Sequence, residues 1–423
     1  MEQILQSFMY PFLFLSMYFQ VFLLISFIEN KKKIKDEEIF DLSYFPSVTI
    51  AVPCWNEEKT LALTIESLLA LDYPREKLKI VIVDDGSKDR TFEIATSYIK
   101  NMPDTIHVIK KENGGKHTAM NLALSHLSTD LFGCLDADSF VQPQALKHII
   151  SYFQRDKEIM AVTPCIQIRN PKTLIQRMQA IEYLMGVFLR KAYGQLDAIQ
   201  VTPGPFSIFR KEVFERVGPY RKAHNTEDFE ITLRMHLHHM KIANAHKALV
   251  YTVGPSTVSG FLKQHLRWAR GFLENAIDYK EMFFKKEYGN FGMFTLPGAF
   301  IFVFYGVYVA FFLLYNIINN IIDHIQKFLT IGIHLPALSF DYFYLDTSTI
   351  SFLSMVMLTA FLFVLYVASE LSDDNQQFFR NFPVFFVMFP ILVPIYISQA
   401  VFDTIFHRKN EWVLQDTKMV NIN

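Results

Sequence analysis

Four stretches of this chain are almost free of charge and long enough to cross the roughly 30 Å hydrocarbon core of a lipid bilayer. They cover residues 9–28, 294–318, 352–368 and 382–402. A charged, mixed stretch separates the first of them from the second. We therefore expect an N-terminal transmembrane helix in residues 1–30, a soluble domain in 31–290, and a transmembrane region with a short tail in 291–423.

The first apolar segment has the features of an uncleaved anchor rather than of a signal peptide. No basic region precedes it, no small-residue cleavage site follows it, and Lys31–Lys33 and Lys35 come directly after it. By the positive-inside rule, these lysines place the soluble domain in the cytoplasm.

The side of the C-terminal tail is left open by the sequence. One helix before the domain and three after it put the tail outside, whereas His407–Lys409 favours the inside. A broken or re-entrant last segment would remove this conflict. That segment contains Pro383, Pro390 and Pro394.

Composition argues against several classes of protein. A net charge of −1 gives no sign of a nucleic-acid partner. The three cysteines, Cys54, Cys134 and Cys165, have neither CxxC spacing nor histidines arranged as zinc ligands. We expect buried, reduced thiols, and neither a disulfide framework nor a zinc site.

The soluble part alternates between strand and helix patterns. Strands are predicted at 47–53, 78–83, 107–109 and 131–135, and helices at 57–70, 91–100 and 119–127. This order predicts a largely parallel sheet, covered on both faces, with ligands at the carboxyl ends of its strands. No GxGxxG motif opens a helix, so a dinucleotide-dependent oxidoreductase is disfavoured.

Polar side chains follow the first two strands. Pro53, Asn56 and Glu57 lie at the end of the first, and Asp84-Asp85-Gly86-Ser87 ends the second. Carboxylates there could accept hydrogen bonds from a base or a ribose, although an Asp-Gly-Ser sequence is often only a turn.

A glycine-rich loop precedes the third predicted helix. Its sequence is Glu112-Asn113-Gly114-Gly115-Lys116. Paired glycines at a helix start let backbone N–H groups approach an anion, and Lys116 adds a positive charge. A solvated loop lysine is the alternative.

Asp136 and Asp138 follow the fourth predicted strand. An Asp-x-Asp sequence is often an ordinary turn. After a buried strand, however, it places two hard oxygen ligands at the rim of the sheet, where Mg²⁺ or Mn²⁺ can bridge to phosphates.

Two further motifs occur later in the same domain. Thr226-Glu227-Asp228 begins a predicted helix at 229–239, where an aspartate can act as a general base or merely stabilise the helix dipole. In a helix at 258–279, Gln264, Arg267, Trp268 and Gly271 share one face. Arginine can bind phosphate and tryptophan can stack on a sugar, but such a stripe also suits a membrane interface.

Two further features of the domain do not indicate a specific function. His236, His238 and His239 cluster on one predicted helix, and His236 and His239, which lack a third ligand in the sequence, are expected at the surface. A second interfacial helix is expected at 166–196.

Taken in order, these motifs resemble the processive, membrane-bound branch of glycosyltransferase family 2. The resemblance covers about 48–271 and is greatest to poly-N-acetylglucosamine synthases, with hyaluronan, chitin and cellulose synthases as more distant relatives. It implies an α/β, Rossmann-like GT-A-type domain plus α-helical transmembrane segments. It also implies an inverting transfer from UDP-N-acetylglucosamine to the end of a growing β-linked polysaccharide, with Mg²⁺ or Mn²⁺ as cofactor.

The resemblance also implies roles for single residues on the donor side. Asp85 would contact the uridine, with Pro53, Asn56 and Glu57 at the nucleoside. Lys116 would lie beside the donor. Asp136 would meet the diphosphate and, with Asp138, the metal.

On the acceptor side, Asp228 is the expected catalytic base, with Glu227 beside it. Gln264, Arg267 and Trp268 would close over the diphosphate and acceptor. Gly204 is expected near the acceptor, but Pro203 and Pro205 flank it, which departs from the family pattern and leaves the acceptor open.

Expected partners are a UDP-sugar, a polysaccharide, the plasma membrane and an accessory membrane or export subunit. Five aromatic residues of the second apolar segment are expected to line an export conduit: Phe302, Phe304, Tyr305, Tyr308 and Phe311. A transferase acting on a lipid acceptor, a synthase of the hyaluronan, chitin or cellulose type with another donor, and an inactive scaffold remain as alternatives.

Overall fold

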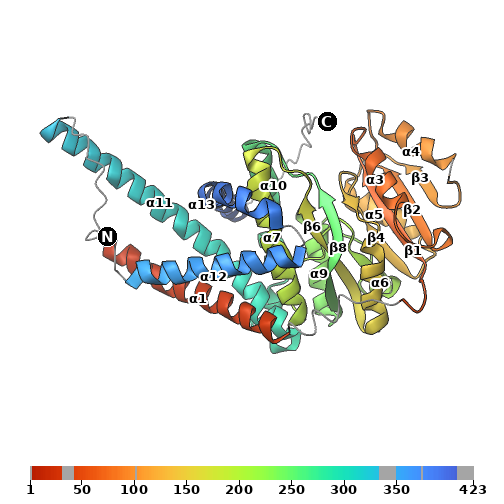
Figure 1. Cartoon of the computed structure of the whole chain (residues 1–423), viewed down its shortest axis with the longest axis horizontal. Coiled ribbons are helices and arrows are strands. Elements are labelled where there is room, and N and C mark those ends of the chain that lie inside the picture. Colours follow the sequence, from red (N-terminus) through yellow and green to blue (C-terminus); the bar gives the residue numbers. More distant parts are fainter. Residues whose placement is uncertain (1, 31–41, 101, 333–348, 373–374, 407–423) are drawn as a thin grey trace.

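The computed structural model describes residues 2–30, 42–100, 102–332, 349–372 and 375–406. Figure 1 shows an α/β domain on one side, from which long helices project to the other.

An eight-stranded sheet forms the centre of the α/β domain, with the order β3-β2-β1-β4-β7-β6-β8-β5. The strands are β1 (Val48–Cys54), β2 (Leu78–Asp84), β3 (Ile106–Lys110), β4 (Leu131–Cys134), β5 (Phe140–Val141), β6 (Ile159–Ile168), β7 (Ile208–Arg210) and β8 (Lys241–Thr252).

The parallel sheet predicted from the sequence is confirmed except at two strands. Strands β3, β2, β1 and β4 are parallel, whereas β7 runs antiparallel to both β4 and β6, and β5 runs antiparallel to β8. The prediction of a largely parallel sheet is therefore wrong at β7 and β5 only, because β6 and β8 pair in parallel. Strand β7 lies between the two parallel groups and runs antiparallel to its neighbour on each side.

Helices cover both faces of the sheet. Val48, Ile50 and Val52 of β1 pack on one face with α3 (Leu61–Leu69) and α6 (Ala145–Arg155), while α4 (Thr91–Ile99) adds Ala95 to the same cluster. Ala51 points to the other face. There it joins a cluster that includes α5 (Lys116–Ser125), α8 (Lys211–Val217) and α9 (Glu227–Leu237).

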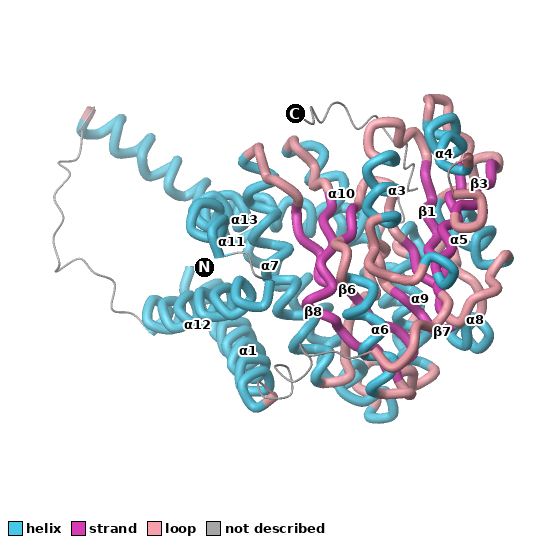
Figure 2. Tube along the Cα trace, turned by 45° about the vertical axis from the view of Figure 1, so that its right-hand side comes forward, coloured by secondary structure: helices cyan, strands magenta, loops and turns pink. Residues whose placement is uncertain are grey.

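Two amphipathic helices, α7 (Leu174–Gln195) and α10 (Val258–Asp278), lie between the α/β domain and the projecting helices (Figure 2). The helix expected at 166–196 starts later than predicted because β6 continues to Ile168. Its start is fixed by a capping box, in which Thr173 and Gln176 bond each other's backbone N–H groups.

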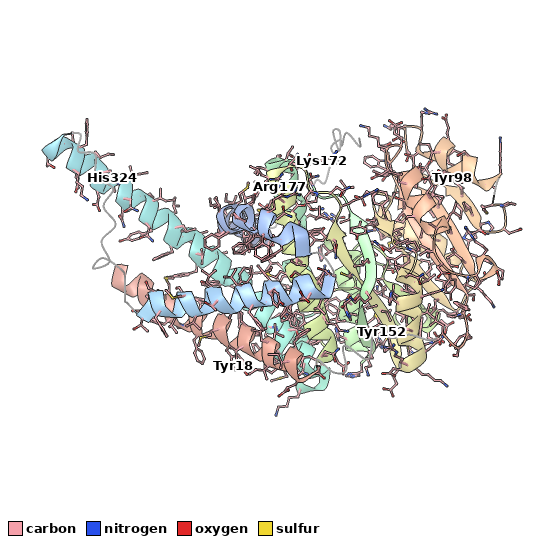
Figure 3. All side chains as sticks on the ribbon, in the orientation of Figure 1. Tyr18, Tyr98, Tyr152, Lys172, Arg177 and His324 are labelled. Atoms are coloured by element: carbon pink, nitrogen blue, oxygen red, sulfur yellow. The ribbon has the colours of Figure 1, made fainter. Side chains whose placement is uncertain are left out.

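The four apolar segments form α1 (Glu2–Glu29), α11 (Leu296–Ile331), α12 (Thr349–Ser372) and α13 (Asn375–Ile405), each long and apolar enough to cross a membrane. Helices α1, α11 and α12 project from the domain in both views (Figures 1 and 2). Tyr18 of α1 and His324 of α11 lie on this projecting part, far from Tyr98 of the domain (Figure 3).

Helices α12 and α13 both pack along α7, and α13 differs from the other three apolar helices in that it also packs along α10. Its prolines do not break it, so the expectation of a broken last segment is wrong: one helix continues from Asn375 to Ile405. Just before it, the carbonyl of Ser372 accepts a bond from Gln167 of β6. Near its end, Tyr396 packs on His265 of α10.

A buried ion pair fixes α9 within the domain. Glu230 accepts bonds from Arg234 Nη2 at 2.8 Å and from the Tyr279 hydroxyl at 2.6 Å, and both charged side chains are almost fully buried. We expect Glu230→Ala to lower the free energy of unfolding by about 3–5 kcal/mol, because it leaves Arg234 charged and buried. Glu215→Ala, which removes an exposed pair with Lys211, is the control. Equal thermal midpoints for the two variants would contradict this.

Candidate active site

The Asp-x-Asp motif lies where β4 ends, as predicted. Lys116, the first residue of α5, forms an ion pair with Asp136 Oδ1, and its Nζ is 3.5 Å from Glu227 Oε1. Burial alone would lower the pKa of Lys116, but Asp136 and Glu227 outweigh it and hold this pKa well above its usual value. Two predicted site residues, Asp136 and Glu227, thus meet at the ammonium group of a third, Lys116.

Gly204 lies against this ion pair. A Cβ atom at Gly204 would stand 2.6 Å from Lys116 Nζ and 3.4 Å from Asp136 Oδ2. The space beside Lys116 therefore depends on glycine at this position, and a Gly204→Ala substitution would displace the ammonium group from Asp136.

Negative charge is concentrated around Asp138. Burial and then Asp136 raise the pKa of Asp138 to about 6. Burial and then Asp138 raise the pKa of Glu57 to about 7. Carboxylates that oppose one another's ionisation in a buried place fit a bound cation, which would stabilise their charged forms.

The donor set suits a divalent metal that also binds phosphate. Among the described residues, no three His, Cys, Asp or Glu side chains lie close enough to hold a metal by themselves. Mg²⁺ and Mn²⁺ are commonly held by one or two carboxylates together with phosphate oxygens of a substrate. Asp136 and Asp138 fit that pattern.

Asp85 is held by the glycine-rich loop. Its carboxylate accepts bonds from Gly114 N at 3.0 Å and Gly115 N at 2.8 Å, and it pairs with the Lys111 ammonium. The backbone donors predicted to bind an anion therefore bind a carboxylate of the chain itself. Lys111 was not identified from the sequence, because nothing distinguishes it from its neighbour Lys110.

The segment after β1 is fixed to the segment after β2. Asn56 adopts a positive φ of 56°, and its Oδ1 accepts a bond from Lys88 N at 2.9 Å. Glu57 N donates to Thr91 Oγ1 at 2.7 Å. These bonds delay the start of α3 to Leu61, four residues after the predicted position, while Pro53 remains within β1.

Asp228 lies in the first turn of α9. Burial, and then Glu227, raises the pKa of Asp228, while Lys116 and Arg267 oppose the shift. Asp228, Glu227 and Gly204 line the same small pocket. The candidate base thus lies next to two residues predicted for the acceptor side, and one of them, Glu227, also approaches Lys116.

The polar face expected on α10 is only partly directed to this pocket. Arg267 lies near Asp228 and donates through Nη1 to Asn225 O at 2.7 Å. The Trp268 ring packs edge-on against His265 at 4.9 Å between centroids. Gln264 Oε1 is buried and has no hydrogen-bond partner among the described residues.

A pair beneath this face was missed from the sequence. His265 Nε2 lies 2.8 Å from Glu182 Oε1 of α7, and its Nδ1 lies 3.0 Å from the Phe261 carbonyl. A single acidic residue on a mostly apolar helix was the available signal for Glu182, but its partner is 83 positions away.

One member of the histidine cluster, His236, does not lie at the surface as predicted. His236 is buried, its Nε2 bonds the Ile199 carbonyl at 2.8 Å, and its ring stacks on Phe291. Burial lowers the pKa of His236 to about 4. His239 is exposed, as predicted, and His238 is exposed as well.

The aromatic residues of α11 do not gather around a passage. Tyr305 and Tyr308 pack on Phe12 of α1. Phe302, Phe304 and Phe311 are exposed. These positions give no support to the expected conduit.

The fold and the site define a GT-A-type glycosyltransferase domain. Its fold is similar to that of a mannosyltransferase from Pyrobaculum calidifontis solved in complex with GDP-Man and Mn²⁺, with a TM-score of 0.53 and 16% identity over 94% of this chain and 99% of that one. Residues 49–218 match the glycosyl transferase family 2 model. This stretch of the chain is therefore similar to that family.

Two curated relatives carry the same description, poly-beta-1,6-N-acetyl-D-glucosamine synthase. The protein of Staphylococcus aureus (strain COL) is 34% identical over 226 residues, which is 53% of this chain and 54% of the relative. The protein of Staphylococcus epidermidis is 29% identical over 321 residues, 75% of this chain and 74% of the relative. The match therefore spans about half the length of the Staphylococcus aureus relative.

Proposed function

We propose that this protein transfers N-acetylglucosamine from UDP-N-acetylglucosamine to the end of a growing β-linked polysaccharide, with inversion at the anomeric carbon. The observation that carries the proposal is the meeting of Asp136, Glu227 and Lys116 beside Gly204, with Asp228 in the same pocket. This arrangement puts groups for a donor diphosphate next to a candidate base. The curated relatives described as poly-beta-1,6-N-acetyl-D-glucosamine synthases support the choice of sugar.

In this proposal the donor is held along the carboxyl ends of β1, β2 and β4. Asp85 contacts the uridine, Asn56 and Glu57 border the nucleoside, and Lys116 lies beside the diphosphate. Asp136 and Asp138 hold Mg²⁺ or Mn²⁺, which would neutralise charge on the leaving diphosphate. The mannosyltransferase of similar fold was solved with Mn²⁺.

Asp228 is the proposed general base. A single displacement needs a base on the face of the sugar opposite the leaving group, where it removes the proton of the attacking hydroxyl. Burial raises the pKa of Asp228, which makes its carboxylate a stronger base than a solvated one. Arg267 and Trp268 are proposed to act on the diphosphate and acceptor side, with Gln264.

A panel of radiolabelled UDP-sugars tests the donor. Purified protein with Mn²⁺ is expected to incorporate N-acetylglucosamine in preference to glucose or glucuronate, and the product should be a polymer on a sugar gel. Preference for another sugar would point to a synthase of a different type. Products of one sugar on a lipid would favour the lipid-acceptor alternative, and absence of all turnover would favour the scaffold.

We further propose that the catalytic domain is cytoplasmic and that the C-terminus lies on the same side of the plasma membrane. The end of α12 bonds β6, and Ala400 of α13 packs with Leu273 of α10. Both ends of α13 therefore contact the side of the molecule that carries the α/β domain. His407–Lys409 is consistent with this orientation.

Thiol labelling tests this topology, because all three native cysteines are buried. With a membrane-impermeant maleimide and intact cells, we expect Leu329→Cys, at the far end of α11, to be labelled. Lys88→Cys in the domain and Phe406→Cys after α13 should react only after permeabilisation. Labelling of Phe406→Cys in intact cells would show that α13 crosses the membrane.

A further inference from the structure

Three consecutive residues just before the candidate base have a left-handed backbone. The φ angles of Ala223, His224 and Asn225 are 45°, 53° and 64°. Such angles crowd Cβ against the following carbonyl, and alanine tolerates them less readily than histidine or asparagine. A run of this kind persists only where surrounding contacts impose it, and these contacts come from α10.

Asn275 of α10 holds the first residue of the run and the residue that follows the run. Its Nδ2 lies 3.1 Å from Ala223 O and 2.9 Å from Thr226 Oγ1, and its side chain is almost fully buried. The last residue of the run is held as well, since Arg267 donates to Asn225 O. The polar atoms of the strained segment are therefore bonded to one face of α10.

His224 adds an ionic tie to the same helix. Its Nδ1 lies 3.0 Å from Glu274 Oε2, and its Nε2 lies 2.8 Å from Asp278 Oδ2. The ring is partly exposed, which limits its effect on stability and leaves orientation as its main contribution.

Thr226, which follows the left-handed run, cannot move closer to α10. A Cβ atom at Gly271 would stand 2.4 Å from both Thr226 Oγ1 and Thr226 Cγ2. Thr226 thus rests directly on the α10 backbone, and Glu227 and Asp228 follow it in the chain.

We propose that α10 sets the position of the Asp228 carboxylate through this left-handed segment, with Asn275 and His224 as positioning residues for sugar transfer. The proposal rests on the proposed role of Asp228 as base. A base displaced by about 1 Å can lose 10²-fold in rate. Because α10 also carries Arg267 and Trp268, one helix would align the base with the residues on the diphosphate side.

The first arm of the test compares Asn275→Leu and His224→Ala with His238→Ala, an exposed histidine directly after α9. We expect the first two to lower kcat by about tenfold or more while KM for UDP-N-acetylglucosamine and Mn²⁺-dependent UDP affinity stay within about twofold. His238→Ala should match the wild type. Loss of UDP affinity in step with kcat would overturn the proposal.

The second arm uses the backbone itself. Glycine accepts a positive φ and valine opposes it, so Ala223→Gly should keep kcat within about twofold, whereas Ala223→Val should lower it about tenfold or more. Equal kcat values for these two variants would overturn the proposal.

Hydrogen exchange separates this idea from the proposed function. Amides of residues 222–230 should exchange faster in Asn275→Leu than in the wild type, whether or not the protein incorporates sugar. Unchanged exchange in this segment would refute the positioning role, while absence of sugar incorporation by the wild type would refute the proposed function instead.

Discussion

Asp228→Asn is expected to reduce the rate of sugar incorporation by ~10²- to 10⁴-fold, which corresponds to roughly 3 to 5 kcal/mol of barrier. Asparagine keeps the shape of the side chain but cannot take the proton of an acceptor hydroxyl. The donor should still bind, since the ion pairs of Lys116 with Asp136 and Glu227 are left intact. Initial rates of incorporation and calorimetric titration with UDP and Mn²⁺ measure the two effects separately.

Asp104→Asn is the matched control for this variant, because Asp104 is exposed on the same domain. It should leave both measurements unchanged. Near-normal incorporation by Asp228→Asn would show that another group is the base, and Glu227 would then be the first residue to examine.

Asp138→Asn is expected to act on binding as well as on turnover. An amide is a weaker metal ligand than a carboxylate, so UDP affinity in the presence of Mn²⁺ should fall by about tenfold or more, or roughly 1.4 kcal/mol. Excess chelator should abolish incorporation by the wild type. UDP binding measured without metal should be similar in wild type and variant, and a variant with undiminished Mn²⁺-dependent binding would exclude Asp138 as a ligand.

The sequence predicted those features that depend on local patterns. Uninterrupted apolar runs identified β1, β2 and β4 and the four long helices, because burial on both sides or in lipid requires such runs. Placing polar motifs at the ends of parallel strands also brought Lys116 and Asp136 together correctly. Their meeting with Glu227 depended on the family resemblance, since that residue lies 91 positions beyond Asp136.

Features set by contacts between distant segments were not predicted. The order of β7, β6 and β8 depends on which strands pair across the sheet, and no local signal encodes it. No glycine in the sequence indicates the left-handed segment at Ala223, because side chains of α10 impose its conformation. Likewise, His236 was placed at the surface by its polarity, whereas its bond to the Ile199 carbonyl makes burial possible.

The proposed contact of Asp85 with the uridine would be limited by the bonds that this carboxylate already makes. A carboxylate accepts about four hydrogen bonds, and Asp85 already receives three, from Gly114, Gly115 and Lys111. A base that bonds Asp85 more than once must displace one of these donors, so that part of binding is an exchange with little net gain in free energy. A base unable to replace the lost bond leaves a buried polar group unpaired. Contacts at Asp85 should therefore discriminate between nucleotides more than they tighten binding.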